Sequence, residues 1–335
     1  MKRAIVLVAL LVAIAGYVFL QPQPPRQDLA GWMPGGALLY LETPDFGRLL
    51  REWDASSVKK QWLASANYDV FSHSNLFAKL AGVYQEYGAA ARFLPDLPAT
   101  AGIAGADSAL ALYGIRDMEF LYITRIGEAQ LAKSQLWAVR DKFEQRRAGG
   151  VSFYLRTEPQ TMRTVAFAFT NGHLFLATRD DLVARALTLM SGGSDPAVRS
   201  ERWYRESIAA ASTPGQLRLV MNLDSLVKSG YFRSYWIQRN ASSVRQYWAG
   251  VADVTRSPAA ITETRLFLRN SEAPATPAVL STLVSLVPPE AGLYRISPRP
   301  APSALAATIV SKLIASPMQQ ALDYRFAPEE CDFPQ

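Results

Sequence analysis

The stretch MRTVAFAFTNGHLFLATRDDLVARALTLMSGG, from Met162 to Gly193, constrains the fold of this chain more than any other. Asn171 and Gly172 tolerate the positive φ angles of a two-residue type I′ turn, and apolar residues alternate on both sides of them. The pattern predicts a β-hairpin. A helix should follow, with Thr178 as its N-cap and Asp181 completing a capping box. The apolar residues at helical spacing on its buried face are Leu182, Val183, Ala186, Leu187 and Met190.

Further strands and a further helix are indicated upstream of this hairpin. Residues 108–113 and 119–124 are rich in β-forming residues, and residues 114–117 supply a turn between them. Residues 128–145 carry apolar side chains at helical spacing, and the glycines at 149–150 should end that helix. Antiparallel hairpins mixed with helices, without regular alternation of strand and helix, indicate an α+β fold.

Two short sequence words recur along the chain. DASSVKKQW at residues 54–62 resembles NASSVRQYW at residues 240–248, and PGGALLYLETP at residues 34–44 aligns without gaps to PPEAGLYRISP at residues 288–298. Such matches also arise by chance in a chain of this length, so their context matters more. The copies at 54–62 and 240–248 each follow an apolar strand and an Asp that can cap a helix, which favours internal repetition.

This repetition predicts how the chain is divided. We expect two related lobes of antiparallel sheet with packed helices, at residues 28–193 and 195–326, followed by an acidic tail at residues 327–335. The run Gly-Gly-Ser-Asp-Pro at residues 192–196 is the best candidate for a boundary between the lobes, because such residues end helices and form loops.

The first residues of the chain are typical of an envelope-targeting segment. Residues 4–20 contain no charged residue and follow Lys2 and Arg3. The small residues at 13–15 offer a signal-peptide processing site, but the apolar run continues to Leu20, which favours an uncleaved anchor.

We therefore predict a transmembrane anchor or signal segment at residues 1–20 and an extended Pro-rich spacer at residues 21–27. The basic residues at the start should stay in the cytoplasm. This places the chain in a bacterial inner membrane with a single pass, and its folded part on the periplasmic or extracytoplasmic side.

The charge distribution bears on the partners of the folded part, and the cysteine content bears on how that part is stabilised. The formal net charge of +6 is spread along the chain without a basic block, so nucleic acid is not expected as a partner of a protein outside the cytoplasm. Cys331 is the single cysteine, so no disulfide can form within the chain and stability must come from burial.

Two segments carry a family resemblance: GWMPGGALLYLETPDFGRLLREWDASSVKKQW at residues 31–62 and FAFTNGHLFLATRDDLVARAL at residues 167–187. They resemble a family of bacterial envelope proteins known only as a domain of unknown function. Such proteins similarly begin with an apolar N-terminal segment, a Pro-led strand ending in Glu-x-Pro-Asp, and a helix that carries Trp. The resemblance implies an envelope location and supplies no catalytic residues.

The chain shows no strong catalytic or metal-binding motif. His73 and His173 lack a second His or Cys at ligand spacing, so each is expected to be solvated or locally hydrogen-bonded. The S-x-x-K pattern begins at Ser56 and Ser57, as in penicillin-recognising enzymes, although their K-T-G partner is absent. An envelope serine hydrolase with Ser57 as nucleophile and Lys60 as base is therefore one alternative, while helix N-capping explains both serines more simply.

A segment between Trp203 and Trp248 interleaves aromatic residues with arginines. Such rings most often form core, but they can also stack on a ligand while Arg pairs with its anionic groups. The residues predicted to bind a ligand there are Tyr231, Arg233, Tyr235, Trp236 and Trp248.

The main functional prediction is a membrane-tethered, non-enzymatic protein that binds or scaffolds an envelope protein, a glycan or a lipid. A second alternative, besides the hydrolase, is a carrier that encloses an apolar ligand such as a lipid between its two lobes. No cofactor and no metal is expected.

Overall fold

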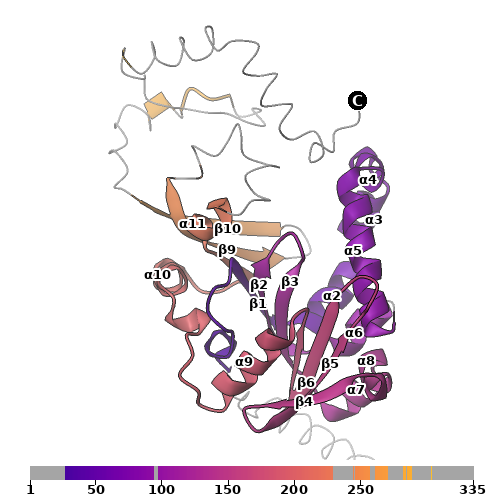
Figure 1. Cartoon of the computed structure of the whole chain (residues 1–335). Coiled ribbons are helices and arrows are strands. Elements are labelled where there is room, and N and C mark those ends of the chain that lie inside the picture. The colour runs from indigo at the N-terminus through magenta and orange to yellow at the C-terminus, as the bar shows by residue number, and fades with distance from the viewer. Residues whose placement is uncertain are drawn as a thin grey trace, which may run out of the picture.

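The computed structural model describes residues 27–93, 97–228, 246–256 and 261–270, and outside these ranges residues 244, 282–283, 285–288 and 303. The described residues form an α+β fold around one ten-stranded sheet (Figure 1). The strand order is β10-β9-β8-β1-β2-β3-β7-β6-β5-β4, and every neighbouring pair is antiparallel. The strands are β1 (Leu39–Asp45), β2 (Ala106–Gly114), β3 (Glu119–Arg125), β4 (Glu144–Ala148), β5 (Val151–Thr157), β6 (Thr164–Thr170), β7 (His173–Ala177), β8 (Leu217–Met221), β9 (Tyr247–Arg256) and β10 (Ile261–Arg269).

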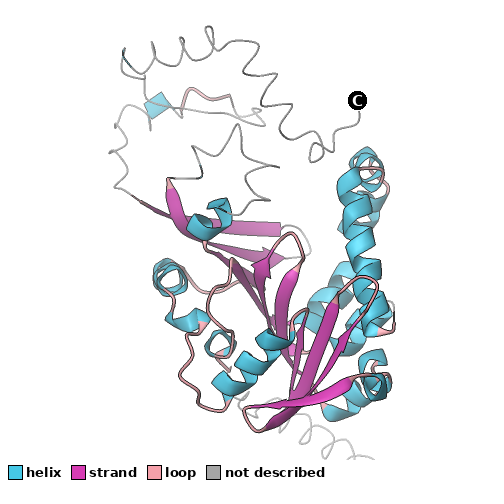
Figure 2. Ribbon diagram, viewed as in Figure 1, coloured by secondary structure: helices cyan, strands magenta, loops and turns pink. Residues whose placement is uncertain are grey.

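Helices lie on both faces of this sheet (Figure 2). The α-helices are α2 (Phe46–Asp54), α3 (Ser57–Leu63), α4 (Ala66–Ser72), α5 (Asn75–Ala91), α6 (Leu97–Ile103), α7 (Glu128–Ala132), α8 (Gln135–Ala138), α9 (Asp180–Met190), α10 (Arg202–Ala210) and α11 (Leu223–Lys228). Short 3-10 turns are η1 (Leu29–Gly31), η2 (Arg140–Lys142) and η3 (Val198–Ser200).

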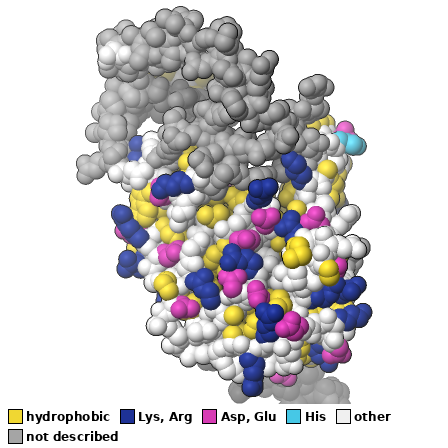
Figure 3. Space-filling view, viewed as in Figure 1, with side chains coloured by type: hydrophobic (Ala, Val, Ile, Leu, Met, Phe, Trp, Pro, Cys, Tyr) yellow, Lys and Arg dark blue, Asp and Glu magenta, His cyan; other side chains and the backbone are white. Residues whose placement is uncertain are grey.

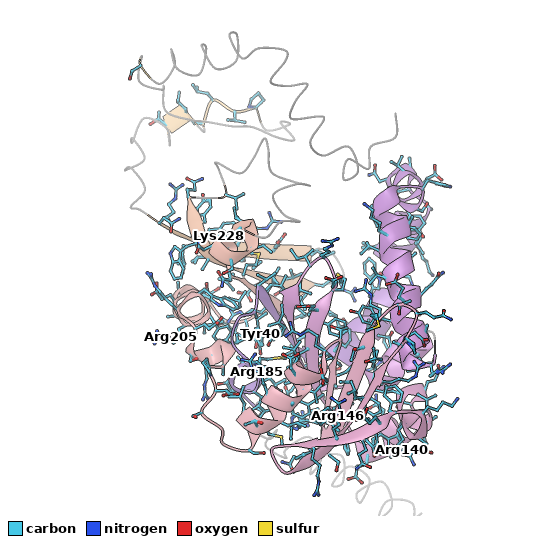
Figure 4. All side chains as sticks on the ribbon, viewed as in Figure 1. Tyr40, Arg140, Arg146, Arg185, Arg205 and Lys228 are labelled. Carbon is cyan, nitrogen blue, oxygen red and sulfur yellow. The ribbon has the colours of Figure 1, made fainter. Side chains whose placement is uncertain are left out.

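One face of the sheet carries the larger of the two hydrophobic cores. Helices α9 and α10, with η1 and η3, pack on it and form the larger hydrophobic core. Tyr40, Leu121 and Phe175 point from the strands into this core and are at most 1% exposed. Figure 4 shows Tyr40 inside the molecule, between the sheet and these helices. This side of the molecule is therefore a filled core.

The opposite face is covered less completely. The C-terminal end of α5 and helices α7 and α8 form a second core there, over β6 and β7. Helices α3 and α4 and the first half of α5 extend beyond the sheet as an arm (Figure 1). We call residues 46–84, which hold α2, α3, α4 and the first part of α5, the helical arm.

The hairpin predicted around Asn171 and Gly172 is confirmed. The two residues have φ angles of 49° and 71°, and they join β6 to β7, which pair from Ala166 with Ala177 to Thr170 with His173. The helix predicted next is α9, whose buried residues include Leu182, Val183, Ala186 and Leu187. Strands β2 and β3 likewise occupy the predicted residues.

The capping box predicted at Thr178 is wrong. The Thr178 hydroxyl accepts a hydrogen bond from the Phe120 N–H at 2.9 Å and donates one to the Met118 carbonyl at 3.1 Å. Arg179 is the residue that precedes α9, and its guanidinium pairs with Asp181 at 2.8 Å. The hydroxyl is used across the sheet because β3 and β7 are neighbours, which local spacing does not reveal.

The helix predicted over residues 128–145 is wrong in its length. The Ser134 hydroxyl accepts a hydrogen bond from the Trp137 N–H, so a new helix, α8, begins where the first one, α7, has ended. Residues 144–148 then pair with β5 as the edge strand β4. Pairing with a neighbouring strand thus overrides the helical spacing at the end of this segment.

The sequence words at 54–62 and 240–248 differ in structure at their ends, although Val58 and its match Val244 are both helical. Trp62 lies in helix α3, whereas Trp248, which matches it in sequence, lies in strand β9. Most of the second copy, and residues 289–298 of the other pair, lie outside the described residues.

The strands of the two predicted lobes join in one sheet. β1 pairs with β8 from Leu39 with Met221 to Glu42 with Arg218, and Pro34 forms an isolated bridge with Ala197. The predicted boundary at residues 192–196 lies in the loop between α9 and η3. The division into two domains stays a prediction.

In the described part of the chain, no helix is long and apolar enough to cross a membrane. The segments predicted as anchor, residues 1–20, and as acidic tail, residues 327–335, lie outside the described residues, as does almost all of the spacer at 21–27. These assignments stay predictions.

Candidate functional site

Four of the five residues predicted to bind a ligand lie outside the described residues: Tyr231, Arg233, Tyr235 and Trp236. The fifth, Trp248, is half-buried and packs against the larger core. The guanidinium carbon of Arg202 lies 4.3 Å from the centre of its ring, and Arg202 also pairs with Glu206 at 2.7 Å. Trp248 thus contributes to packing, and a ligand-binding role of the set stays a prediction.

Of the two S-x-x-K serines, Ser56 is the N-cap of α3 and Ser57 is the first residue of that helix. The Ser56 hydroxyl accepts a hydrogen bond from the Lys59 N–H at 3.1 Å and donates one to the Trp53 carbonyl, and the Lys59 amine pairs with Asp54 at 2.5 Å. Ser57 and Lys60 are both exposed, and the described contacts include no hydrogen bond between them. The geometry does not present an activated serine.

His173 is buried and locally hydrogen-bonded, which is one of the two states expected for it. Its ring is 7% exposed, Nδ1 lies 2.9 Å from the Asn171 carbonyl, and Trp32 meets the ring edge-on at a centroid distance of 5.0 Å. Burial lowers the pKa of His173 below its ordinary value, more than the hydrogen bond to Asn171 raises it. Nε2 has no hydrogen-bond partner among the described residues. Residue 173 therefore belongs to the core, because it points to the same side of β7 as Phe175.

The most distinct candidate site is a cavity of about 520 Å³ between helix α5 and the less covered face of the sheet. Its floor is a row of side chains that are neighbours in register: Leu41 on β1, Leu110 on β2, Tyr122 on β3 and Leu176 on β7. Its opposite wall is α5, with Leu80, Val83, Tyr84 and Tyr87. A volume of this size is typical of a ligand-binding pocket.

The cavity exists because α5 leaves the sheet as it runs into the helical arm. Leu41, Leu110 and Leu176 stay partly exposed in this row, whereas Leu121, on the other side of the sheet, is fully buried. Among the described residues of α5, those packed in or against the second core are Tyr87, Ala90 and Ala91, at its C-terminal end. The face above β1, β2 and β3 is therefore apolar, and the side chains of the described residues do not fill the space above it.

The polar groups in the cavity wall are satisfied by the protein itself. Ser108 Oγ lies 2.6 Å from Thr124 Oγ1, and the Tyr87 hydroxyl donates to the Asp117 carbonyl at 2.7 Å. Burial raises the pKa of Tyr122, more than its hydrogen bond to Ser108 lowers it, so its hydroxyl stays neutral. None of the described side chains that line the cavity is charged. The site is suited to an apolar ligand.

No metal centre is found among the described residues, since no three His, Cys, Asp or Glu side chains lie close enough to hold an ion.

Sequence reasoning missed this cavity. Two features of the sequence could have indicated it: the apolar side of β1, β2 and β3, and the apolar residues of α5. The apolar surface of these strands is larger than one helix can cover when that helix leaves the sheet. Period and spacing predict that such residues face inward, but they do not tell a filled interior from a hollow one.

Comparisons with known proteins add little to this geometry. The chain matches no family model and no curated protein. Among solved structures, crystal form I of TP0453 is similar with a TM-score of 0.38 and 12% sequence identity, over 78% of this chain and 86% of that one. Crystal form IV of TP0453 has a TM-score of 0.37 and 12% identity, over 70% of this chain and 78% of that one. These values are too low to assign a function.

Proposed function

We propose that this chain is a membrane-tethered protein of the bacterial envelope that binds an apolar ligand, such as the hydrocarbon chain of a lipid, in the cavity under α5. The observation that carries the proposal is the 520 Å³ space with an uncharged, apolar lining. Burial of hydrocarbon in such a space is favourable by about 25 cal/mol for each Å² of apolar surface removed from water.

The ligand position proposed here differs from the one in the carrier alternative of the sequence analysis. That alternative placed the ligand between two lobes, whereas the cavity lies between α5 and strands β1, β2, β3, β6 and β7, all within residues 28–193. The envelope location and the membrane tether are proposed from the uncharged run at residues 4–20 and the Pro-rich residues that follow it.

A photoreactive fatty acid tests the proposal in the full chain, reconstituted in lipid vesicles. A palmitic acid that carries a diazirine is activated by light, and the labelled peptides are identified by mass spectrometry. We expect labels to gather on α5 and on the strands of the cavity floor.

Two matched Trp variants decide whether the label reports the cavity. Leu110→Trp places a larger side chain in the cavity, and Ile261→Trp places the same side chain at an exposed position of the edge strand β10. Labelling of α5 should fall strongly in Leu110→Trp and stay unchanged in Ile261→Trp. Equal labelling of the cavity peptides in both variants, with both folded, would show that the proposal is wrong.

A further inference from the structure

The helical arm exposes apolar side chains to an unusual degree. Helices α3 and α4 contain no buried residue at all. Among the described large hydrophobic residues, more than half of those that are strongly exposed lie on this arm: Trp53, Val58, Trp62, Leu63, Val70, Leu80 and Tyr84. In the space-filling view, hydrophobic and basic side chains share the visible surface of the arm (Figure 3). A concentration of this kind marks an interaction surface.

The arm is held together by ring contacts and not by a closed core. The ring of Trp62 lies edge-on to that of Tyr68 at 6.0 Å, and the rings of Phe71 and Phe77 lie 5.4 Å apart. These contacts connect α3, α4 and α5 to one another. They leave Val58, Leu63 and Val70 pointing outward, where nothing in the described part of the chain covers them.

The exposed surface of the arm is continuous with the cavity. Leu80 and Tyr84 lie on α5, one turn apart, and each is both exposed to solvent and part of the cavity lining. An apolar ligand that reaches the arm can therefore enter the cavity along one side of α5 without crossing a charged side chain of the lining.

The charges of the arm favour an anionic surface. Between Phe46 and Lys79 the sequence has five basic residues against three acidic ones: Arg48, Arg51, Lys59, Lys60 and Lys79 against Glu52, Asp54 and Asp69. Short amphipathic helices that combine Trp and Leu with Lys and Arg bind at the interface of lipid bilayers, with their apolar face in the headgroup region. Basic residues near an anionic bilayer add to this attraction.

We propose that the helical arm docks on the surface of a lipid bilayer that contains anionic lipids, and that apolar ligand passes from that bilayer along α5 into the cavity. The inference rests in part on the proposed function, since the cavity gives the docked arm its purpose. A bilayer fits as the occupant for two reasons. It can cover the exposed apolar side chains of α3 and α4, and it is a source of the apolar ligand.

A fluorescent label on the arm tests the docking. In the full chain with Cys331→Ser, an NBD dye is attached at Val70→Cys on α4 or, as a control, at Met162→Cys. Val70 and Met162 are exposed to a similar extent, 69% and 73%, but Met162 lies in the loop between β5 and β6, outside the helical arm. Both positions are on the surface, so neither variant should disturb folding.

The readout is quenching of the dye by lipids that carry a nitroxide near the headgroup. The described chain begins next to η1, which lies far from the tip of the arm (Figure 1). The bilayer that holds the proposed anchor and the bilayer on which the arm docks can therefore be different ones. For this reason the nitroxide lipid is placed either in the vesicle that holds the protein or in separate vesicles of phosphatidylcholine and phosphatidylglycerol. An interfacial helix enters a bilayer by about 5–10 Å, so we expect quenching by roughly half at residue 70 in one of the two arrangements, and little at residue 162.

Three results would overturn the docking. The first is equal quenching at residues 70 and 162. The second is an absence of quenching at residue 70 in both arrangements. The third is a blue shift at residue 70 that rises with protein concentration in detergent without lipid, which would show that a second copy of the chain covers the arm.

The variant Leu110→Trp separates this inference from the proposed function. It fills the cavity and leaves the arm unchanged, so quenching at residue 70 should persist while fatty-acid labelling of α5 falls. Quenching without any cavity labelling in the native chain would leave the docking in place and refute the proposed function. Cavity labelling without quenching would refute the docking alone.

Discussion

The guanidinium of Arg218 meets the carboxylate of Asp253 in a two-point contact, with Nε to Oδ1 and Nη2 to Oδ2 both at 2.8 Å. The two residues are partners in register on β8 and β9, and both are buried. Arg218 also donates to the Ser212 carbonyl at 2.6 Å, and the Gly215 N–H donates to Asp253 Oδ1 at 3.3 Å. The pair thus connects β8 and β9 to the loop that precedes β8.

Removal of one charge from this pair should be costly. Asp253→Asn leaves the Arg218 guanidinium buried without its counter-ion, so we expect the free energy of unfolding to fall by about 3–5 kcal/mol. Urea unfolding of the full chain measures the change. The double variant Arg218→Met with Asp253→Leu should recover most of the loss, because it leaves no buried charge.

The control is Asp224→Asn, which breaks an exposed pair with Lys228 and should cost less than about 1 kcal/mol. Equal losses in Asp253→Asn and Asp224→Asn would contradict the prediction.

His173 should make the stability of the fold depend on pH. Burial lowers its pKa in the folded state, so below the ordinary value of 6.5 the unfolded chain takes up a proton more readily than the folded one. Stability should therefore fall as the pH drops through this range and stay constant above it. Unfolding free energies at about pH 7.5 and about pH 5 should differ less in His173→Gln than in the native chain. His73→Gln, at an exposed position, is the control and should keep the native difference. An unchanged pH dependence in His173→Gln would show that other groups cause it.

Two leucines on opposite faces of the sheet test whether the cavity is hollow. Leu121 on β3 is fully buried in the filled core, so Leu121→Ala should reduce stability by about 2.7–5 kcal/mol. Leu110 on β2 borders the cavity and is partly exposed, so Leu110→Ala removes fewer contacts and should cost less than about 2 kcal/mol. Denaturant melts of both variants give the comparison. A similar loss in the two would mean that the space under α5 is filled.

Two glycines should respond to alanine in opposite directions. A Cβ at Gly105 would overlap the Arg125 carbonyl oxygen and lie 2.7 Å from Thr124 Oγ1, so Gly105→Ala should reduce stability by about 1–3 kcal/mol. Gly82 lies in α5, and a Cβ added there would meet no atom within 4 Å, so Gly82→Ala should raise stability by about 0.5–1 kcal/mol. Thermal unfolding of the two variants shows the signs. A stabilising effect at residue 105 would contradict the close approach of Gly105 to β3.

Local structure was predictable where a few neighbouring residues decide the backbone. The turn at Asn171 and Gly172 requires positive φ angles that these residues accept, and the helix cap Ser56 accepts a hydrogen bond from an N–H three residues ahead. Thr178 and residues 128–145 were assigned wrongly because partners on other strands compete for the same groups.

Sequence alone determined the α+β class, the main hairpin, helix α9 and most strands near it, since alternation and helical spacing reflect which side of an element is apolar. Only the tertiary structure decided that β1 joins β8 in one sheet, that His173 lies inside, and that α5 leaves the sheet to open a cavity. Periodicity marks a residue as inward-facing, but the distance to the next packed element decides whether that residue meets another side chain or an empty space.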